Sequence, residues 1–303
     1  MTGTLYTLLA ALGFAAVSTF TEIAMGDGAS LWNVLMWRFV IGAVVMIALI
    51  AIRRYPRLAA GDAARWIVIG GGGQALLIGM ALSSLQFINI ATLAFLFYTY
   101  PAWVAVVQAV RGAERLTGLR VAALGLSFVG IAIVAGSPLN DGGVPWQGAL
   151  LGLGAAIVYA LFIPLMQWMQ KDHPIPLTSA YAKVGSAVCF LVLGLGGGSV
   201  TARMEPGAWA AIVGLATLST VLPSIFFMMG LMRLGPVRTA IVSTVEPFIT
   251  AMLGAAVLAQ PITANTILGG ALIVGAVLLL QAKRATPSPG AAAPSLPSTS
   301  ATR

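Results

Sequence analysis

Charged residues are scarce in this chain of 303 residues, in which Asp, Glu, Lys and Arg together make up 8%. In soluble globular proteins roughly a quarter of the residues are charged. With 59% hydrophobic residues and a mean hydropathy of +0.97, the chain lies far outside the soluble range. The composition therefore predicts a membrane protein.

Histidine and cysteine are almost absent, with one residue of each type. Cys189 has no second cysteine in the chain, so it cannot form an intrachain disulfide. His173 lies in a basic connection, so neither a Ser–His pair nor an HExxH zinc site can form within the apolar stretches. We expect no catalytic residue, no metal site and no cofactor, and therefore not an enzyme.

Long polar segments are also missing, because almost the whole chain divides into apolar stretches of about 20 residues, the length of a membrane-spanning helix. We predict ten such helices, at residues 4–24, 31–52, 66–87, 89–110, 117–136, 147–169, 176–197, 208–232, 236–258 and 264–282. The connections are too short for a soluble ATPase or receptor domain. Residues 285–303 are rich in Pro, Ser, Ala and Thr, which predicts a disordered tail.

Basic residues gather in alternate connections. If the first helix enters from the cytoplasm as an uncleaved span, thirteen of the sixteen Lys and Arg residues lie on the cytoplasmic side and only Arg203 on the other. The positive-inside rule then predicts both termini in the cytoplasm of a multi-pass protein of the bacterial inner membrane. This distribution argues against nucleic acid as a partner. The expected partners are the lipid bilayer and a small-molecule substrate, with protons as a possible coupling ion, for a monomer or homodimer.

The two halves of the chain resemble each other. Residues 94–101 line up with residues 240–247 at an offset of 146 (247 − 101), and Phe14 matches Tyr159 at an offset of 145 (159 − 14). Because each half has five spans, an odd number, the second half enters the membrane from the opposite side. We therefore predict an all-α membrane protein of ten transmembrane helices, with inverted five-helix repeats at residues 1–140 and 141–284.

Three charged residues lie inside predicted spans, namely Arg38, Lys183 and Glu246. A charge at bilayer depth costs on the order of 2.5–3.5 kcal/mol on insertion scales, so these side chains should face a protein-lined or watery interior. Arg38 and Lys183, which are repeat mates, either bind a substrate carboxylate or anchor carbonyl groups of neighbouring helices. Glu246 is a candidate partner for a proton or a substrate amine, with a structural salt bridge or a hydrogen bond between helices as the alternative.

Proline and aromatic residues mark further candidate positions. Tyr100-Pro101 and Glu246-Pro247 fall near the middle of their spans, where proline removes a backbone hydrogen bond, so we predict hinges at Pro101 and Pro247. Aromatic side chains within spans suit the walls of a pocket, although packing or lipid contact is the alternative. The predicted substrate-binding residues are Trp37, Arg38, Tyr98, Tyr100, Tyr159, Tyr181, Lys183, Ser243, Thr244 and Glu246.

Other aromatic and glycine residues receive simpler interpretations. Trp103 and Trp168 also lie within spans, whereas Trp32, Trp66, Trp146 and Trp209 stand at span ends and are predicted to form an interfacial belt. The glycines at 70–73 lack the Lys and Ser or Thr of a phosphate-binding loop, so we expect close helix packing there.

Several stretches together carry a resemblance to a known family. These are Trp37-Arg38-Phe39, Ala91 to Pro101 followed by Gly112 to Leu116, and Val245 to Phe248 with Gly269-Gly270-Ala271. In their order and spacing they resemble the EamA family of the drug/metabolite transporter superfamily, over about residues 3–283. The resemblance is strongest to bacterial exporters of amino acids and metabolites.

The resemblance implies ten helices in two inverted halves and secondary transport by alternating access around a midplane site. It also implies export of small amphipathic metabolites, with amino acids, including aromatic ones, as the first expectation and organic cations or drugs as the alternative. Facilitated diffusion and proton antiport both remain open. A small-solute channel is the competing class, but its polar residues would run the full length of several helices, whereas here they cluster near mid-span.

Overall fold

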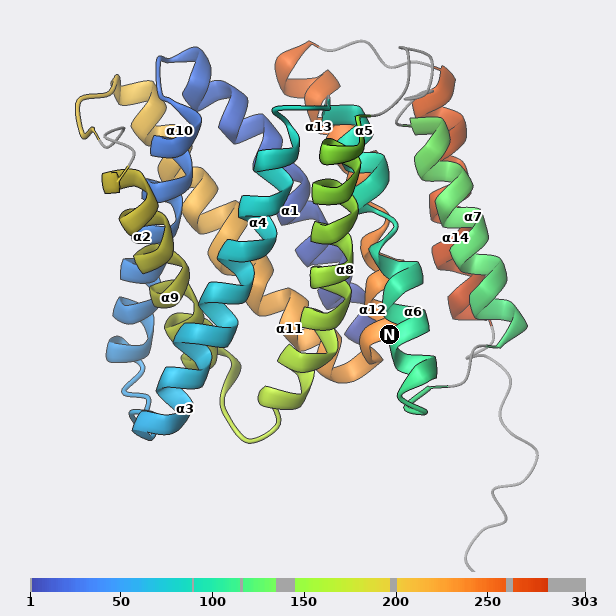
Figure 1. Ribbon diagram of the computed structural model, residues 1–303, viewed down its shortest axis with the longest axis horizontal. Coiled ribbons are helices and arrows are strands. Elements are labelled where there is room, and N and C mark those ends of the chain that lie inside the picture. The colour runs from blue at the N-terminus through green and yellow to red at the C-terminus, as the bar shows by residue number, and fades with distance from the viewer. Residues whose placement is uncertain are drawn as a thin grey trace, which may run out of the picture.

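The protein is helical throughout the part of the chain that the computed structural model describes, which comprises residues 2–88, 90–114, 117–134, 145–196, 201–259 and 264–282 (Figure 1). The elements of the first half are α1 (Thr2–Gly26), α2 (Leu31–Ile52), α3 (Ala60–Arg65), η1 (Trp66–Gly72), α4 (Gly73–Ser84), α5 (Ile90–Phe97), α6 (Tyr100–Val110) and α7 (Gly118–Val134). Those of the second half are α8 (Trp146–Met169), α9 (Ile175–Gly196), α10 (Pro206–Ala216), η2 (Thr217–Val221), α11 (Leu222–Leu234), α12 (Pro236–Ser243), α13 (Glu246–Leu258) and α14 (Ala264–Ala282).

Eight helical stretches within the described ranges are long and apolar enough to cross a membrane. Four of them contain more than one element, because α3, η1 and α4 continue into one another, as do α10, η2 and α11, while α5 is followed closely by α6 and α12 by α13. The stretches predicted at 117–136 and 264–282 correspond to α7 and α14, which contain shorter apolar segments. Helices are the expected solution for such sequences, because each helix satisfies its own backbone hydrogen bonds without water.

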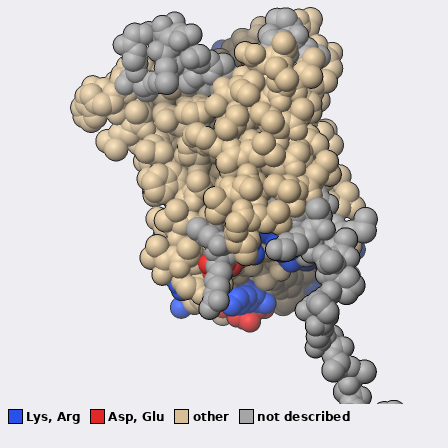
Figure 2. Space-filling view, turned by 90° about the vertical axis from the view of Figure 1, so that its right-hand side faces the viewer, with Lys and Arg blue, Asp and Glu red and all other residues tan. Residues whose placement is uncertain are grey.

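Basic residues mark one end of the molecule, which we call the basic end. Figure 2 shows Lys and Arg gathered there, beside a broad surface without charged residues. Contacts between distant segments place several connections at this end. The guanidinium of Arg233, in α11, lies 4.7 Å from the ring centre of Tyr6 near the start of α1. The carboxylate of Glu114, after α6, lies against Gly235 at the start of α12.

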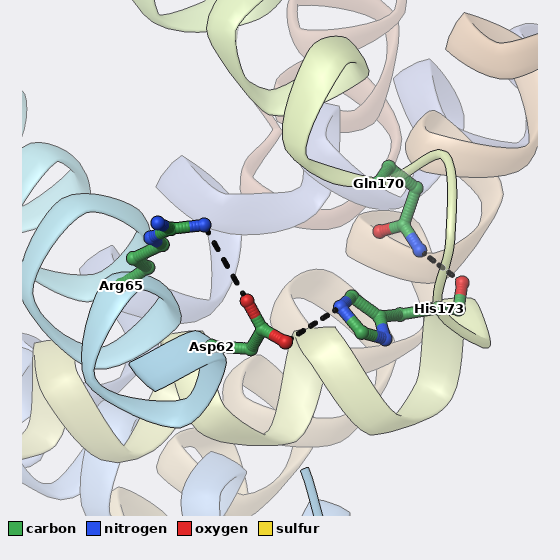
Figure 3. Close-up of polar contacts among 4 residues, drawn as sticks. All are labelled: Asp62, Arg65, Gln170 and His173. Carbon is green, nitrogen blue, oxygen red and sulfur yellow. Dashed lines mark hydrogen bonds and ion pairs between the residues drawn. The ribbon is translucent and has the colours of Figure 1, made fainter. Parts of the chain in front are cut away.

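The connection between α8 and α9 is fastened to α3 at the basic end (Figure 3). The Gln170 side chain donates to the carbonyl oxygen of His173 at 2.7 Å and accepts from the Thr178 hydroxyl at 2.7 Å. His173 Nε2 lies 3.5 Å from one carboxylate oxygen of Asp62, and Arg65 lies 3.5 Å from the other. These contacts join the entry of α9 to the entry of η1.

Small residues allow the helices to pack closely. α1 runs through the middle of the molecule and packs against α10, α11 and α13, while α2 and η1 both pack against α9 (Figure 1). A Cβ atom placed on Gly71 would lie 2.5 Å from the Cα atom of Gly185, so these two backbones are in direct contact. The predicted close packing at the glycine run is therefore confirmed. α7 and α14 pair with each other at one edge, where Gly130 faces the carbonyl oxygen of Gly269.

Candidate functional site

Lys183 lies in the interior, where only 3% of its surface is exposed. Its ammonium group donates to the side-chain oxygen of Gln74 at 3.0 Å, and the Ser186 hydroxyl is 3.1 Å from the same oxygen. The close contact between η1 and α9 brings these groups together, and the Ser186 hydroxyl also lies 3.1 Å from the carbonyl oxygen of Gly71. Lys183 is eight residues beyond the start of α9, about 12 Å along the helix from the basic end (183 − 175 = 8).

Arg38 has a similar environment, and it too is buried and bound to a residue of the other half of the chain. It is 9% exposed, and its Nε donates to the Thr220 hydroxyl at 2.6 Å. Thr220 lies in η2 and donates in turn to the carbonyl oxygen of Leu215 at 2.8 Å. Gln74 is the second residue after the end of η1. Gln74 and Thr220 are separated by the repeat offset (220 − 74 = 146). Each buried cation is therefore bound beside a π-helical turn of the other half, and π-helical turns occur frequently at functional sites.

One aromatic ring lies next to both cations. The Arg38 guanidinium lies 5.3 Å and the Lys183 ammonium 5.5 Å from the ring centre of Phe39. Phe39 stacks on Phe190 with ring centres 4.9 Å apart and an interplanar angle of 8°. The cations thus contact an aromatic face, which offers partial electrostatic compensation in the absence of water.

The two predicted hinge positions coincide with helix interruptions. α5 ends at Phe97 and α6 begins at Tyr100-Pro101, whereas α12 ends at Ser243 and α13 begins at Glu246-Pro247. Proline fits the first turn of a helix, where its missing N–H has no intrahelical acceptor in any case. Glu246 consequently stands at the N-terminus of α13, where the helix dipole favours a negative charge. A hinge motion at Pro101 and Pro247 remains a prediction.

Glu246 lies beside a group of tyrosines and interacts electrostatically with Arg38. The Tyr98 hydroxyl is a hydrogen-bond donor to the Glu246 carboxylate, and Arg38 interacts with that carboxylate electrostatically. Tyr100 packs against Tyr159 with ring centres 4.7 Å apart and against Tyr98 at 6.3 Å. Three of the four predicted tyrosines and the carboxylate therefore form one cluster.

A cavity of about 100 Å³ lies next to this cluster, on the side toward the basic end. Its lining is aromatic and aliphatic, apart from Gln74, Lys183 and two serines. The lining residues are Phe14, Trp66, Gly70, Gln74, Leu77, Tyr159, Phe162, Ile163, Met166, Ser179, Ala182, Lys183, Ser224, Phe227 and Met228. Tyr159 belongs to both the cavity wall and the tyrosine cluster, so it connects the two. The volume is sufficient for several water molecules.

The remaining predicted residues lie outside the cavity wall. Trp37 donates from its indole to the carbonyl oxygen of Thr201 at 3.0 Å and packs on Trp209 at 5.0 Å, so it joins α2 to the entry of α10. Ser243 is buried next to the tyrosine cluster. Thr244 donates to the carbonyl oxygen of Ile241 at 2.7 Å and lies 3.2 Å from the Ser127 hydroxyl of α7, a helix-to-helix contact. Tyr181 packs at the edge of the core cluster around Tyr159.

One tryptophan interpretation needs correction. Trp66 is 3% exposed and lines the cavity, instead of standing in an interfacial belt, because Gly70 leaves room for its ring against the helix. Trp168 is 58% exposed, which agrees with lipid contact, the alternative given for aromatic residues within spans. Trp32 and Trp146, at 45% and 70% exposed, have the surface position predicted for belt residues.

Sequence reasoning did not select several residues of the cavity wall. Three phenylalanines of the wall were not selected, namely Phe14 of α1, Phe162 of α8 and Phe227 of α11. The ring centre of Phe227 lies 6.3 Å from that of Phe14 and 6.5 Å from that of Tyr159. The repeat contained one signal, since Phe14 and Tyr159 are repeat mates and both line the cavity. Phe162 and Phe227 have no such mark, because each is one of many apolar residues in its span.

A helical, multi-pass membrane protein with a mostly apolar cavity that holds a few polar groups between its helices is the class that this arrangement defines. The chain belongs to the EamA-like transporter family, whose sequence model matches residues 1–136 and again residues 146–281. Transport and membrane location are thereby established at the level of the family.

Relatives agree with this assignment, and a solved structure agrees with the fold. An uncharacterized transporter of Archaeoglobus fulgidus is 24% identical over 208 residues, which cover 67% of this chain and 72% of the relative. An uncharacterized transporter of Bacillus subtilis is 22% identical over 253 residues, covering 80% and 81%. A solved crystal structure matches with a TM-score of 0.77 at 19% identity, covering 93% of this chain and 98% of that one, and supports the fold alone.

Proposed function

We propose that this protein is a secondary transporter that exports small amphipathic metabolites, with amino acids, including aromatic ones, as the first candidates. Ten spans form two inverted five-helix repeats, and the solute site lies at their interface near the bilayer midplane, as in other transporters built from inverted repeats. Both termini lie in the cytoplasm of a bacterial inner membrane, so the basic end is the cytoplasmic end.

The observation that carries the proposal is the cavity that joins a buried cation to an aromatic wall. Lys183 and Gln74 supply polar groups on one side, while Phe14, Tyr159 and Phe227 supply aromatic surface on the other. Ligand sites commonly combine mostly apolar walls with a few polar groups that orient the solute. A small amphipathic metabolite has the matching distribution of charged and apolar surface.

Equivalent contacts in the two halves support the inverted repeat. Arg38 binds Thr220 and Lys183 binds Gln74, with both partners displaced by the repeat offset. The two helix interruptions before Pro101 and Pro247 also match at that offset. The halves therefore offer two similar arrangements around one central site, which is the basis for alternating access.

The ends of the molecule differ in a way that supports alternating access. The cavity lining extends toward the basic end through Trp66 and Ser179. At the other end Asn33 accepts from the Thr201 backbone at 3.0 Å, and Trp37 donates to Thr201, so α2 is fastened to the segment before α10. We therefore assign this conformation to the inward-facing state of the transport cycle, in which Trp37 closes the extracytoplasmic end.

Counterflow in proteoliposomes tests the proposal. Vesicles loaded with unlabelled amino acid should accumulate the labelled form transiently and saturably, because a carrier exchanges solutes through one site. A matched panel of organic cations tests the alternative substrate class in the same vesicles. Uptake that does not saturate and shows no exchange would identify a channel and contradict the proposal.

A further inference from the structure

The interior of the protein contains more positive than negative charge around the cavity. Arg38, Lys183 and Glu246 are the ionisable groups that act on one another there. Glu246 interacts with Arg38, whereas the charge that acts on Lys183 is Arg38, of the same sign. Among the ion pairs of the described residues, none includes Lys183 or Arg38, so Glu246 acts on Arg38 from beyond ion-pair distance. Of the two cations, Arg38 thus has a carboxylate acting on it, whereas the charge acting on Lys183 is positive.

The repeat explains why this carboxylate is missing. Arg38 in the first half is compensated by Glu246 in the second half, so the equivalent partner of Lys183 would be the repeat mate of Glu246 in the first half. That mate is Tyr100, at an offset of 146 (246 − 100). Tyr100 is uncharged as a phenol, and its hydroxyl points to the Ala240 carbonyl oxygen at 3.4 Å. The first half therefore has an uncharged phenol where the second half has a carboxylate, so the repeat supplies Lys183 with no negative charge from this position.

The lining of the cavity also favours a negatively charged group. Lys183 is the one charged residue in its lining, and the carboxylate of Glu246 does not belong to that lining. An ammonium group has three donors, of which one is taken by Gln74. A buried ammonium without an anion is costly, and a bound anion with hydrogen bonds to it removes that cost.

We propose that the transported solute carries a carboxylate or an equivalent anionic group, which binds Lys183 in the cavity, while its apolar body lies against Tyr159 and Phe227. This inference rests on the proposed function and narrows its substrate class to organic anions and zwitterions. Cations without an anionic group are disfavoured, because among the described residues of the cavity wall the charge they meet is that of Lys183, which is positive. Gln74 is uncharged, and its side-chain oxygen holds the ammonium group of Lys183 in position.

Three probes of one shape test the proposal on the wild-type protein. Phenylalanine, 3-phenylpropionate and phenethylamine share an aromatic body and differ in having both charged groups, only the carboxylate or only the amine. Binding is measured in detergent as ligand-induced protection against thermal unfolding, and transport is measured separately by counterflow. Phenylalanine and 3-phenylpropionate should protect the protein, whereas phenethylamine should bind at least about tenfold more weakly, because charge-assisted hydrogen bonds contribute that much or more.

Substitutions assign the effect to the residue. K183M removes the charge and should weaken binding of 3-phenylpropionate by about ten- to a hundredfold. K171M is the matched control, since Lys171 is exposed in the connection after α8 and should leave binding unchanged. Q74L provides a second variant that keeps the lysine, and it should weaken the same probe less than K183M does.

The outcomes separate this inference from the proposed function. Protection by phenethylamine equal to that by 3-phenylpropionate, or no protection by 3-phenylpropionate, would overturn the inference, as would full binding to a folded K183M. Counterflow of cations in place of carboxylates would also overturn it, while leaving a transporter. Selective protection by the two carboxylates without any counterflow would support the anion site and contradict the proposed transport activity.

Discussion

The contact between Gly71 and Gly185 leads to the most direct prediction. In G71A the new Cβ atom would lie 2.5 Å from the Cα atom of Gly185 and 2.6 Å from the Ala182 carbonyl oxygen. Both are backbone atoms, so no side chain can rotate away. Carbon atoms pack at roughly 3.5 Å or more, so η1 and α9 have to separate by about 1 Å.

The magnitude follows from what this separation disrupts. Overpacking of a tight contact costs about 1–3 kcal/mol in free energy of unfolding. A shift of about 1 Å also stretches the Lys183–Gln74 hydrogen bond from 3.0 Å to a distance beyond hydrogen-bond range. G71A should therefore lower both the stability of the protein and its affinity for a solute that binds Lys183.

Gly72 offers a matched control one residue away. A Cβ atom on Gly72 would meet nothing within 4 Å, so G72A should be neutral or stabilise the helix by about 0.5–1 kcal/mol. The assay is thermal unfolding of the purified variants in detergent, followed by the fraction that remains monodisperse on size-exclusion chromatography. Equal stability of G71A and G72A would refute the reasoning, because it would mean that α9 does not rest on the η1 backbone.

Two further predictions concern the tyrosine cluster and the α12–α13 junction. E246Q keeps the shape of the side chain but cannot exchange a proton, so it should abolish the response of proteoliposome flux to a pH gradient while concentration-driven flux persists; an undiminished response would rule out Glu246 as the coupling group. T244V should destabilise the protein by about 0.5–1.5 kcal/mol, because it removes the hydroxyl that bonds to Ile241 and contacts Ser127. In a thermal-unfolding double-mutant cycle with S127A the two costs should be less than additive, and strict additivity would show that the hydroxyls do not interact.

Spans and interior charges follow from local properties of the sequence. A run of about 20 apolar residues forms a helix in a bilayer whatever its neighbours are, because its backbone polar groups have no other partners. The predicted bounds of α2, 31–52, therefore agree with the structure, and those of α1, 4–24, differ by two residues at each end. Buried charges such as Lys183 and Arg38 stand out for the same reason, since each is costly outside a polar interior.

The composition of the site depends on how the helices pack side by side. Trp37 and Arg38 are neighbours in the sequence, yet successive residues of a helix point about 100° apart, so Trp37 bonds to the segment before α10 and Arg38 enters the interior. Trp66 is buried because Gly70 and α9 make room for it, which its position at a span end does not reveal.

By itself, the sequence determined the helical membrane fold, the repeat offset and the residues too polar to face lipid, because hydrophobicity and spacing act along one chain segment at a time. Only the tertiary structure decided that Lys183 meets Gln74, which is 109 residues away, and that Glu246 interacts with Arg38, while no ion pair of the described residues includes Lys183. Those pairings depend on which faces of separate helices come into contact. Gly71 and Gly185 permit that contact, because neither residue has a Cβ atom to keep the two backbones apart.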